Sequence, residues 1–181
     1  MRKLEKGEKE MKRMYCLLLL GLLSVTCAVN AQIKTITIAN ITWMAENVNT
    51  VTPGSWTFNG IKENGAKYGR LYTWEAAQKV CPAGWKLPTE DDWAKLAKAL
   101  GGEEVAGKKL KINGSSGFNA KLAGYSNGGS FWFLESYGGF WTSTGYDKEH
   151  AWYIFLTQKE NSLTKTYFSK SYGFSVRCIK K

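Results

Sequence analysis

Three residue types are scarce in this sequence, whose 181 residues include three prolines, four cysteines and one histidine. So few prolines exclude a proline-rich linker or stalk. His150 and the two cysteines outside residues 1–31 cannot supply the four protein ligands of a structural zinc site. The sequence also lacks Gly-x-Ser-x-Gly, a paired-histidine metal motif and a phosphate-binding loop. We therefore expect no metal, no cofactor and no enzyme activity.

Aromatic residues and glycine are abundant instead. Phe, Trp and Tyr make up 14% of the chain, hydrophobic residues 44%, and there are 19 glycines. This composition argues against disorder and is typical of a compact domain with many turns. Residues 32–181 are enough for one domain with a core of its own.

The positive charge of the chain is spread thinly. Of the formal net charge of +10, residues 1–31 hold six of the 25 Lys and Arg and three of the 15 Asp and Glu, which leaves +7 for the remainder. The remaining lysines form only small clusters, at 108–111 and 180–181. Nucleic-acid binders show a denser basic stripe or a known module, so we expect no nucleic-acid partner. A mild attraction to acidic surfaces or anionic glycans is the most that this charge implies.

Residues 1–31 have the layout of a secretory signal peptide. Lys12 and Arg13 precede the apolar run 14–25, and Val29 and Ala31 are the small residues that precede a cleavage site. The apolar run is shorter than the roughly 20 residues that span a bilayer as a helix. We predict cleavage after Ala31 and no transmembrane span in the mature protein.

Two other interpretations of the leader stay open. It could act as an N-terminal membrane anchor, or Cys27 could carry a lipid, although Thr26 stands where lipoproteins have Gly, Ala or Ser. Translation could also start at Met11 or Met14 rather than Met1, because the first ten residues are unusually charged for a leader.

The remaining cysteines predict a structural disulfide. Cys16 and Cys27 fall in the leader, so the mature chain keeps Cys81 and Cys178. An even pair of cysteines in an exported protein is typically oxidised, because that compartment favours disulfides. We therefore expect a bond between Cys81 and Cys178.

The pattern of hydrophobic residues predicts an α+β fold with two helices. One helix is expected over 74–80 after the N-cap Thr73, and a second starts after Thr89, whose partner Asp92 completes a variant of the capping box. Glycines at 101 and 102 end the second helix, and we expect the acidic pair 103–104 to trail it in solvent. Turn signals fill 47–65, and strands are expected at 33–38, 41–44, 140–144, 151–156 and 174–179.

A long glycine-rich stretch, 107–139, shows no helical period and predicts loops with short strands. Aromatic residues are threaded through it. Because aromatic rings offer a large contact area at low entropic cost, Tyr125, Trp132 and Tyr137 are our candidate ligand-binding residues. Packing inside the domain is the alternative role for each of them.

Several separated motifs resemble a known family. The segment 73–96, TWEAAQKVCPAGWKLPTEDDWAKL, resembles the two-helix segment of C-type-lectin-like domains. Residues 33–180 resemble the Fibrobacter succinogenes major paralogous domain, through motifs that occur in order at 43–47, 68–72, 81–85, 87–89, 141–144 and 173–178. The resemblance implies a C-type-lectin-like fold with short antiparallel strands, long irregular loops and paired terminal strands. It also implies that a helix cysteine bonds to one in the last strand, and an exported protein of Bacteroidetes or Fibrobacteres.

Two activities of related folds should not be carried over. Calcium-dependent lectins carry Glu-Pro-Asn or Gln-Pro-Asp followed by Trp-Asn-Asp, and neither tripeptide pattern occurs here. Formylglycine-generating enzymes need an active-site pair of copper-binding cysteines, whereas the cysteines that remain here stand where the fold has its disulfide.

We therefore expect an exported, non-catalytic binding module that recognises a glycan or a cell-surface protein through its long loops. It would be secreted, periplasmic or displayed on the cell surface. A structural or adhesin subunit of a surface assembly is the alternative, and the acidic groups at 90–92 and 103–104 leave an envelope hydrolase as a weaker one.

Overall fold

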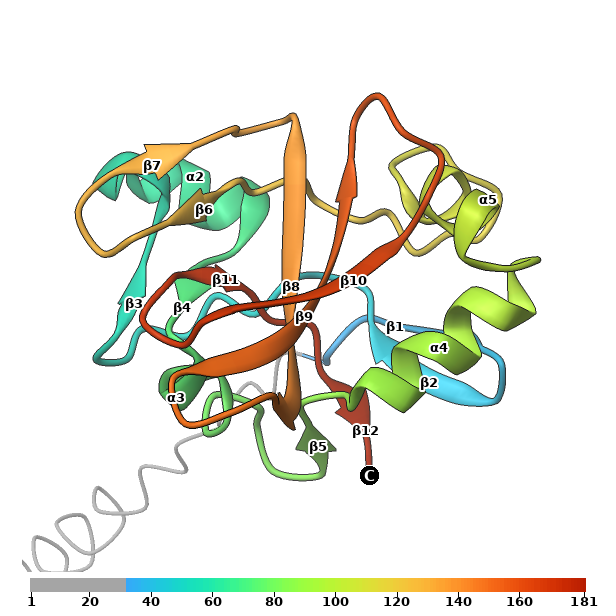
Figure 1. Cartoon of the computed structure of the whole chain (residues 1–181), viewed down its shortest axis with the longest axis horizontal. Helices are drawn as coiled ribbons and strands as arrows, with labels where there is room; N and C mark the ends of the chain where they lie inside the picture. Colours follow the sequence, from blue (N-terminus) through green and yellow to red (C-terminus); the bar gives the residue numbers. More distant parts are fainter. Residues whose placement is uncertain (1–31) are drawn as a thin grey trace, which may run out of the picture. The chain divides into compact units, whose positions relative to one another are not determined.

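The computed structural model describes residues 32–181, and the expected leader lies outside them. The fold is α+β, as predicted (Figure 1). Its described part contains four α-helices rather than the two expected. These are α2 (Lys62–Tyr68), α3 (Trp74–Ala77), α4 (Glu90–Ala99) and α5 (Glu103–Leu110), with a 3-10 turn, η1, at Phe58–Gly60.

The strands form three sheets. A four-stranded sheet has the order β1 (Thr35–Ile38), β2 (Ile41–Met44), β12 (Ile179–Lys180), β5 (Trp85–Lys86). A six-stranded sheet has the order β10 (Thr164–Ser169), β9 (His150–Thr157), β8 (Tyr137–Gly145), β11 (Phe174–Ser175), β4 (Leu71–Tyr72), β3 (Ser55–Trp56). The hairpin of β6 (Tyr125–Ser126) and β7 (Phe131–Trp132) stands apart. The expected pairing of the terminal strands is present, because β12 lies antiparallel to β2 with Ile179 opposite Trp43.

Helix α4 forms for the reasons that its sequence predicts. The side chain of Thr89 accepts a hydrogen bond from the Asp92 N–H, and the Asp92 carboxylate accepts one from the Thr89 N–H, which completes the capping box. The helix buries Trp93, Leu96 and Ala97 on one face. Helix α3 is shorter than expected, because the N–H of Lys79 bonds back to the Ala76 carbonyl and the chain then leaves the helix toward Cys81.

Helices α2 and α5 were not predicted, because each contains a glycine that reads as a turn signal. The reason for each glycine is tertiary contact. A Cβ at Gly65 would lie 2.6 Å from the Thr57 methyl group, and one at Gly107 would lie 2.0 Å from the Ser162 carbonyl oxygen. The prediction that residues 103–104 trail a helix end was wrong, since they open α5 near the positive end of its dipole.

The glycine-rich stretch contains loops and the short strands β6 and β7, as predicted, but its last residues belong to the long strand β8. Strand β8 begins at Tyr137 rather than 140, because Gly138 and Gly139 leave space for neighbouring side chains. A Cβ at Gly139 would lie 2.5 Å from the ring of Phe174. Strand β10 was not predicted. The strand expected over 174–179 is divided into β11 and β12, and Ser175 and Arg177 are as buried as Phe174 and Cys178.

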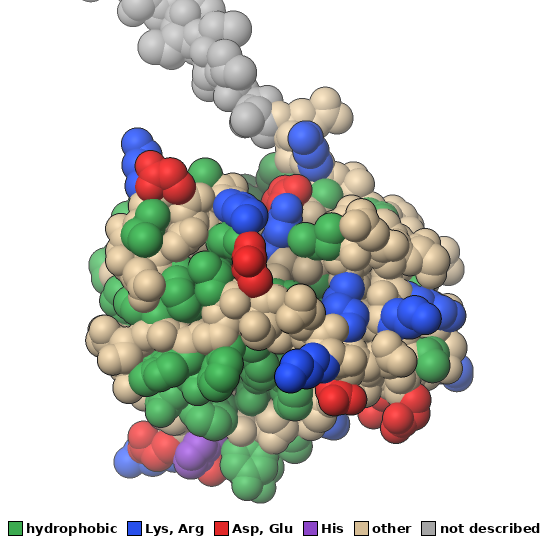
Figure 2. Space-filling view, turned by 90° about the horizontal axis from the view of Figure 1, so that it is seen from above, with side chains coloured by type: hydrophobic (Ala, Val, Ile, Leu, Met, Phe, Trp, Pro, Cys, Tyr) green, Lys and Arg blue, Asp and Glu red, His purple; other side chains and the backbone are tan. Residues whose placement is uncertain are grey.

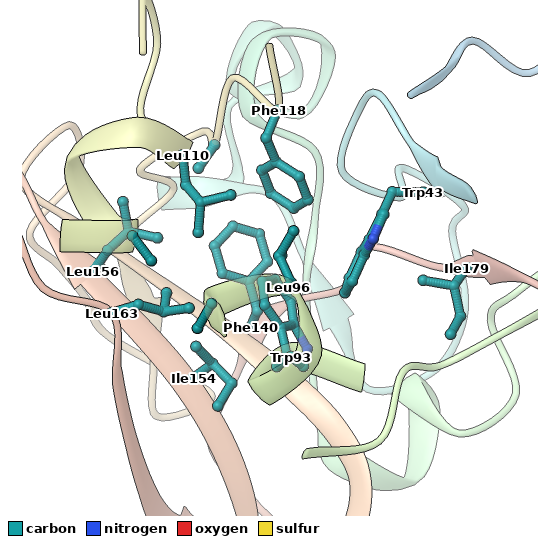
Figure 3. Packing of buried hydrophobic residues seen from close by; sticks show 13 residues of the cluster. Trp43, Trp93, Leu96, Leu110, Phe118, Phe140, Ile154, Leu156, Leu163 and Ile179 are labelled. Atoms are coloured by element: carbon teal, nitrogen blue, oxygen red, sulfur yellow. The ribbon is translucent and has the colours of Figure 1, made fainter. Parts of the chain in front are cut away.

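The main core lies between α4, α5 and the sheets (Figure 3). Its centre is aromatic: the ring of Trp93 lies 4.8 Å from that of Trp43 and 5.4 Å from that of Phe140. Phe118 packs edge-on against both tryptophans. The fully buried rings hold the N-terminal strands, α4 and β8 together, so the candidate loops are carried on a rigid base.

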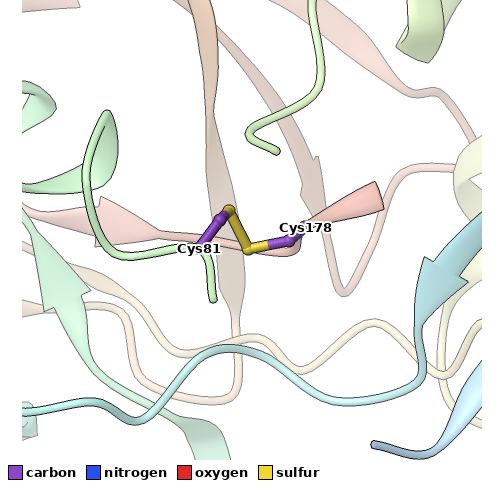
Figure 4. Close-up of a disulfide and its surroundings, with 2 residues drawn as sticks. All are labelled: Cys81 and Cys178. Carbon is purple, nitrogen blue, oxygen red and sulfur yellow. A yellow bond between two sulfur atoms is a disulfide. The ribbon is translucent and has the colours of Figure 1, made fainter. Parts of the chain in front are cut away.

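A second core contains the disulfide that we expected. The bond joins Cys81, just after α3, to Cys178, just before β12, with the two Cα atoms 5.9 Å apart (Figure 4). It closes a loop of 97 residues, which stabilises the fold by about 4–5 kcal/mol on the chain-entropy estimate. The bond therefore links the first half of the domain to its last strand.

A buried arginine ties together three motifs of the sequence. Arg177 is fully buried, and its guanidinium donates to the Asn47 side-chain oxygen at 2.7 and 3.1 Å and to the Phe118 carbonyl. The Asn47 amide in turn donates to the Tyr68 carbonyl and to the Ser175 hydroxyl. Burial lowers the pKa of Arg177 to about 9, which leaves it charged at neutral pH. This network explains why residues 47 and 177 are polar although both lie in the core.

Candidate functional site

The structure brings the three candidate aromatic residues together. Tyr125 lies on β6, Trp132 on β7 and Tyr137 at the start of β8, and all three are half-buried. The ring centre of Tyr125 is 5.3 Å from that of Trp132 and 5.8 Å from that of Tyr137. The hairpin β6–β7 therefore places the rings of Tyr125 and Trp132 close to that of Tyr137. Each ring also packs against its neighbours, so the packing role that we left open is present as well.

The three residues belong to a larger surface, which we call the aromatic face. It comprises seven partly or well exposed side chains, Tyr125, Trp132, Phe133, Tyr137, Phe155, Phe168 and Tyr172. Within it, neighbouring rings lie close together: Tyr137 stacks on Phe155 at 5.2 Å, and Phe168 meets Tyr172 at 4.5 Å. The ring centre of Tyr125 lies 6.2 Å from that of Tyr172, which joins the hairpin to the turn after β10.

Two buried rings form the floor of the aromatic face. Phe174 and Tyr153 stack in parallel with ring centres 4.4 Å apart, and Phe174 is also in contact with Tyr125 and Phe168. The floor fits because Gly139, the third residue of β8, has no side chain where the Phe174 ring lies. The face is thus supported by packing rather than by loops alone.

The strand register determines which other side chains share this face. In antiparallel strands, residues directly opposite each other point to the same side of the sheet. Tyr153 is opposite Thr166, and Phe155 is opposite Thr164, so threonine side chains from β10 lie on the same side of the sheet as the rings. Trp152 and Ile154 point to the other side of the sheet, where Ile154 enters the main core.

The backbone beside the face is strained. Phe133 has a φ of +61° and is 58% exposed, although bulky residues rarely adopt positive φ. Its ring lies 5.9 Å from that of Tyr125. An exposed aromatic residue held in an unfavourable conformation costs free energy of about 1–3 kcal/mol, and such residues cluster at binding sites.

Glu135, which also has positive φ, is engaged by two neighbours. Its carboxylate accepts hydrogen bonds from the Tyr68 hydroxyl and from the Lys67 ammonium group. The Tyr68 bond, followed by the Lys67 bond, lowers the pKa of Glu135, so this carboxylate is ionised and paired at neutral pH. The contact joins the end of the hairpin segment to α2.

Two hydroxyl groups of the face bond to each other. The Tyr137 and Tyr153 hydroxyls are 2.9 Å apart, and burial raises the pKa of both phenols. Within residues 32–181, no hydrogen bond reaches the hydroxyls of Tyr125 and Tyr172, whose side chains are partly exposed. Unlike the hydroxyls of Tyr137 and Tyr153, these two are not bonded to each other or to another group of the described residues.

The hairpin and the start of β8 lie on the upper side of the molecule in Figure 1. Figure 2 looks onto that side and shows hydrophobic side chains gathered in a broad group, with charged side chains along its borders. Contiguous exposed apolar surface of this kind marks interaction sites in proteins.

Sequence analysis missed four members of the aromatic face, Phe133, Phe155, Phe168 and Tyr172. The alternation of Tyr153 and Phe155 with Trp152 and Ile154 was a usable signal for Phe155, because it shows that aromatic residues occupy one side of β9. Phe168 and Tyr172 had no such signal, since β10 itself was not predicted.

A second aromatic cluster lies on the opposite side of the same strands. The rings of Tyr146 and Tyr167 stack at 3.9 Å, and Trp152 packs edge-on against both. Beside it, the His150 imidazole is 2.9 Å from the Asp147 carboxylate. Because this cluster is also aromatic but lies on the other side of the sheet, a variant in it can serve as a control for variants of the aromatic face.

A wide hollow of about 610 Å³ is lined mainly by lysines and polar residues of 105–115. Two of its lysines are already engaged: Lys109 donates to the Leu100 carbonyl, and Lys111 donates to the carbonyls of Thr157, Gln158 and Glu160. The described residues contain no group of three His, Cys, Asp or Glu side chains placed to hold a metal ion. They also contain no helix with the length and apolar character needed to cross a membrane.

Comparison with known proteins gave one match. The sequence model of the Fibrobacter succinogenes major domain matches residues 36–180. No curated protein and no solved structure matches the chain.

Proposed function

Because the chain belongs to the Fibrobacter succinogenes major domain family, we propose that it is an exported, non-catalytic binding module whose aromatic face recognises a glycan or a cell-surface partner. The observation that carries this proposal is the aromatic face itself. It collects Tyr125, Trp132 and Tyr137 with four further rings on one surface, over a rigid floor. Large, rigid aromatic side chains are enriched at recognition sites.

The strain at Phe133 supports the same surface. Its ring is 58% exposed, yet the backbone holds it at positive φ beside Tyr125. A side chain that contributes little to the core but is held in an unfavourable conformation is more easily explained by a contact with a ligand.

We also propose that the fold is C-type-lectin-like. Two features support it: the terminal strands pair, with Ile179 opposite Trp43, and a cysteine just after a helix bonds to one just before the last strand. The hairpin β6–β7 lies between the last helix and the closing strands of this chain.

Export is supported by the layout of residues 1–31 and by the disulfide, since disulfides persist in oxidising compartments. The mature protein would be secreted, periplasmic or at the cell surface. Mass spectrometry of the exported protein without reduction should find an N-terminus at Gln32 and no free thiol. A lipid on Cys27 would instead indicate anchoring.

The absence of catalysis is part of the proposal. The aromatic face offers phenol and threonine hydroxyls and no carboxylate pair. The Asp147–His150 pair lies beside the second aromatic cluster, and within the described residues no hydroxyl is hydrogen-bonded to its imidazole.

A structural or adhesin subunit of a surface assembly is the second candidate. The exposed rings of Phe133 and Phe168, 58% and 38% exposed, favour it, because apolar surface can equally bind a protein. A glycan and a protein would both bind to the aromatic face, so an experiment has to distinguish them.

The test is a screen of the oxidised mature protein against a glycan array and against cell-envelope proteins, with calcium and with EDTA. Binding should survive EDTA and be lost in the Tyr125→Ala and Phe133→Asn variants. Asparagine tolerates positive φ, so Phe133→Asn removes the ring without adding strain.

The matched control is Tyr167→Ala, which removes a ring 43% exposed on the opposite side of the sheet. Binding that is lost equally in this control, or that is unaffected by both variants of the aromatic face, would rule out the face as the site.

A further inference from the structure

We propose that the ligand of the aromatic face is an uncharged polysaccharide chain, an inference that rests on the binding function proposed above. An anionic glycan and a second copy of this chain are the other occupants to consider. The charges, hydroxyl groups and exposed areas of the face decide among the three.

The face has no charged side chain in its strand-borne part. By strand register, β8, β9 and β10 direct onto it Tyr137, Gly139, Trp141, Ala151, Tyr153, Phe155, Thr157, Thr164, Thr166 and Phe168. The charged residue of β10, Lys165, is opposite Ile154 and points to the other side, where its ammonium group meets the Glu90 carboxylate. A carboxylated or sulfated chain would therefore meet aromatic rings with no cation to pair with its charges, which is costly once water is displaced.

Two charged residues, Glu135 and Lys170, stand two positions from rings of the face, and both are engaged by other groups. Glu135 follows Phe133 by two residues, and its carboxylate is bound by Lys67 and Tyr68. Lys170, between Phe168 and Tyr172 in the sequence, donates to the carbonyls of Asp147 and Lys148 and lies over the Trp74 ring. Other lysines also have contacts of their own. Of those in the hollow at 105–115, Lys109 and Lys111 bind backbone carbonyls rather than facing the rings.

The polar groups that the face does offer are hydroxyls. Those of Tyr125 and Tyr172 have no hydrogen-bond partner within residues 32–181, and Thr164 and Thr166 add two more beside the rings. A hydroxyl both donates and accepts hydrogen bonds, as do the hydroxyls of a sugar. Rings that cover the flat apolar side of a sugar, with hydroxyls between them, suit a neutral sugar chain.

A second copy of the chain fits the face less well. A stable dimer buries about 800 Å² on each partner, with an apolar centre. Of the seven rings of the face, only Phe133 and Phe168 are well exposed, at 58% and 38%. The remaining rings are half-buried already, which leaves them suited to stacking rather than to insertion into a partner.

The experiment measures binding of the mature protein to three pairs of soluble polymers: β-glucan, xylan and mannan, each neutral and carboxymethylated. Affinity electrophoresis at low and at high NaCl gives the dissociation constants. The expected result is binding to at least one neutral polymer, unchanged by salt, and at least tenfold weaker binding to its carboxymethylated form. Tyr125→Ala should weaken neutral binding about thirtyfold, the size of a binding hot spot. Tyr167→Ala should change it less than twofold.

Three results would overturn the inference. Preference for a carboxymethylated polymer that disappears at high salt would show that charge drives binding. Failure of all six polymers to bind would exclude a neutral chain of these classes, while the proposed function would fall only if the wider glycan and protein screen were also blank. A dimer seen by light scattering that Phe133→Asn dissociates would assign the face to self-association. If Tyr125→Ala does not fold, Phe133→Asn tests the same face, because residue 133 contributes little to the core.

Discussion

Replacing Gly107 by alanine tests whether tertiary contact or helix propensity decides the structure of α5. In an exposed helix, Gly→Ala raises stability by about 1 kcal/mol, because alanine loses less backbone entropy on folding. Here we expect the opposite sign. A Cβ at Gly107 would lie 2.0 Å from the Ser162 carbonyl oxygen and 2.8 Å from that of Asn161, both backbone atoms that cannot rotate away.

The size of the effect follows from what must move. Displacing 161–163 from α5 costs about 1–3 kcal/mol in overpacking. It also weakens two backbone hydrogen bonds, from Lys108 to Asn161 at 2.9 Å and from Leu163 to Glu103 at 2.8 Å, each contributing about 1 kcal/mol. After the gain in helix propensity is subtracted, Gly107→Ala should lower the free energy of unfolding by about 2–4 kcal/mol.

Chemical denaturation of the oxidised domain measures this change, with circular dichroism as the probe. Gly129→Ala is the control, because a Cβ there meets no atom within 4 Å. Gly107→Ala should lower the free energy of unfolding, while Gly129→Ala stays within about 0.5 kcal/mol of the wild type. A stabilised Gly107→Ala variant would refute the contact between α5 and 161–163, and with it our reason for the glycine.

Two further predictions concern buried polar groups. Asn47→Ala leaves the Arg177 guanidinium buried without its side-chain acceptor, so it should lower the free energy of unfolding by about 3–5 kcal/mol. The double variant Asn47→Ala/Arg177→Met should lower it by less than the sum of the two single variants, because the unpaired charge is gone. Denaturation of the four proteins measures the coupling, and strict additivity would contradict the network. Because burial raises the pKa of Tyr137 and Tyr153, their phenols ionise more readily in the unfolded chain, so stability should fall as the pH rises above about 10. Tyr137→Phe should make that fall less steep in melting experiments at pH 9–11, and an unchanged slope would count against the buried hydroxyl pair.

The local signals in the sequence were reliable where they came from short-range physics. The capping box at Thr89 and Asp92 fixes the start of α4 through hydrogen bonds within four residues, and it was predicted correctly. With residues 1–31 set aside, the two remaining cysteines could pair only with each other. The aromatic candidates were chosen by composition alone, and the hairpin β6–β7 brings two of them beside the third.

The rest of the candidate site depended on contacts between distant segments. Phe168 and Tyr172 reach the aromatic face because β10 pairs with β9, and β10 has no strong strand pattern of its own. The floor exists because the ring of Phe174 occupies the space left by Gly139, 35 positions earlier in the chain. No window of sequence contains both partners of such a contact.

The sequence by itself therefore determined the class of the fold, the position of α4, the disulfide and the family, since each rests on local patterns or on residue identity. Only the tertiary structure decided which glycines stand inside helices and strands. At Gly65, Gly107 and Gly139, a segment distant in the sequence lies where a side chain would be. It also decided that seven rings form one uncharged surface. Side-chain burial and strand register depend on which segments pack together, and that is a property of the whole domain.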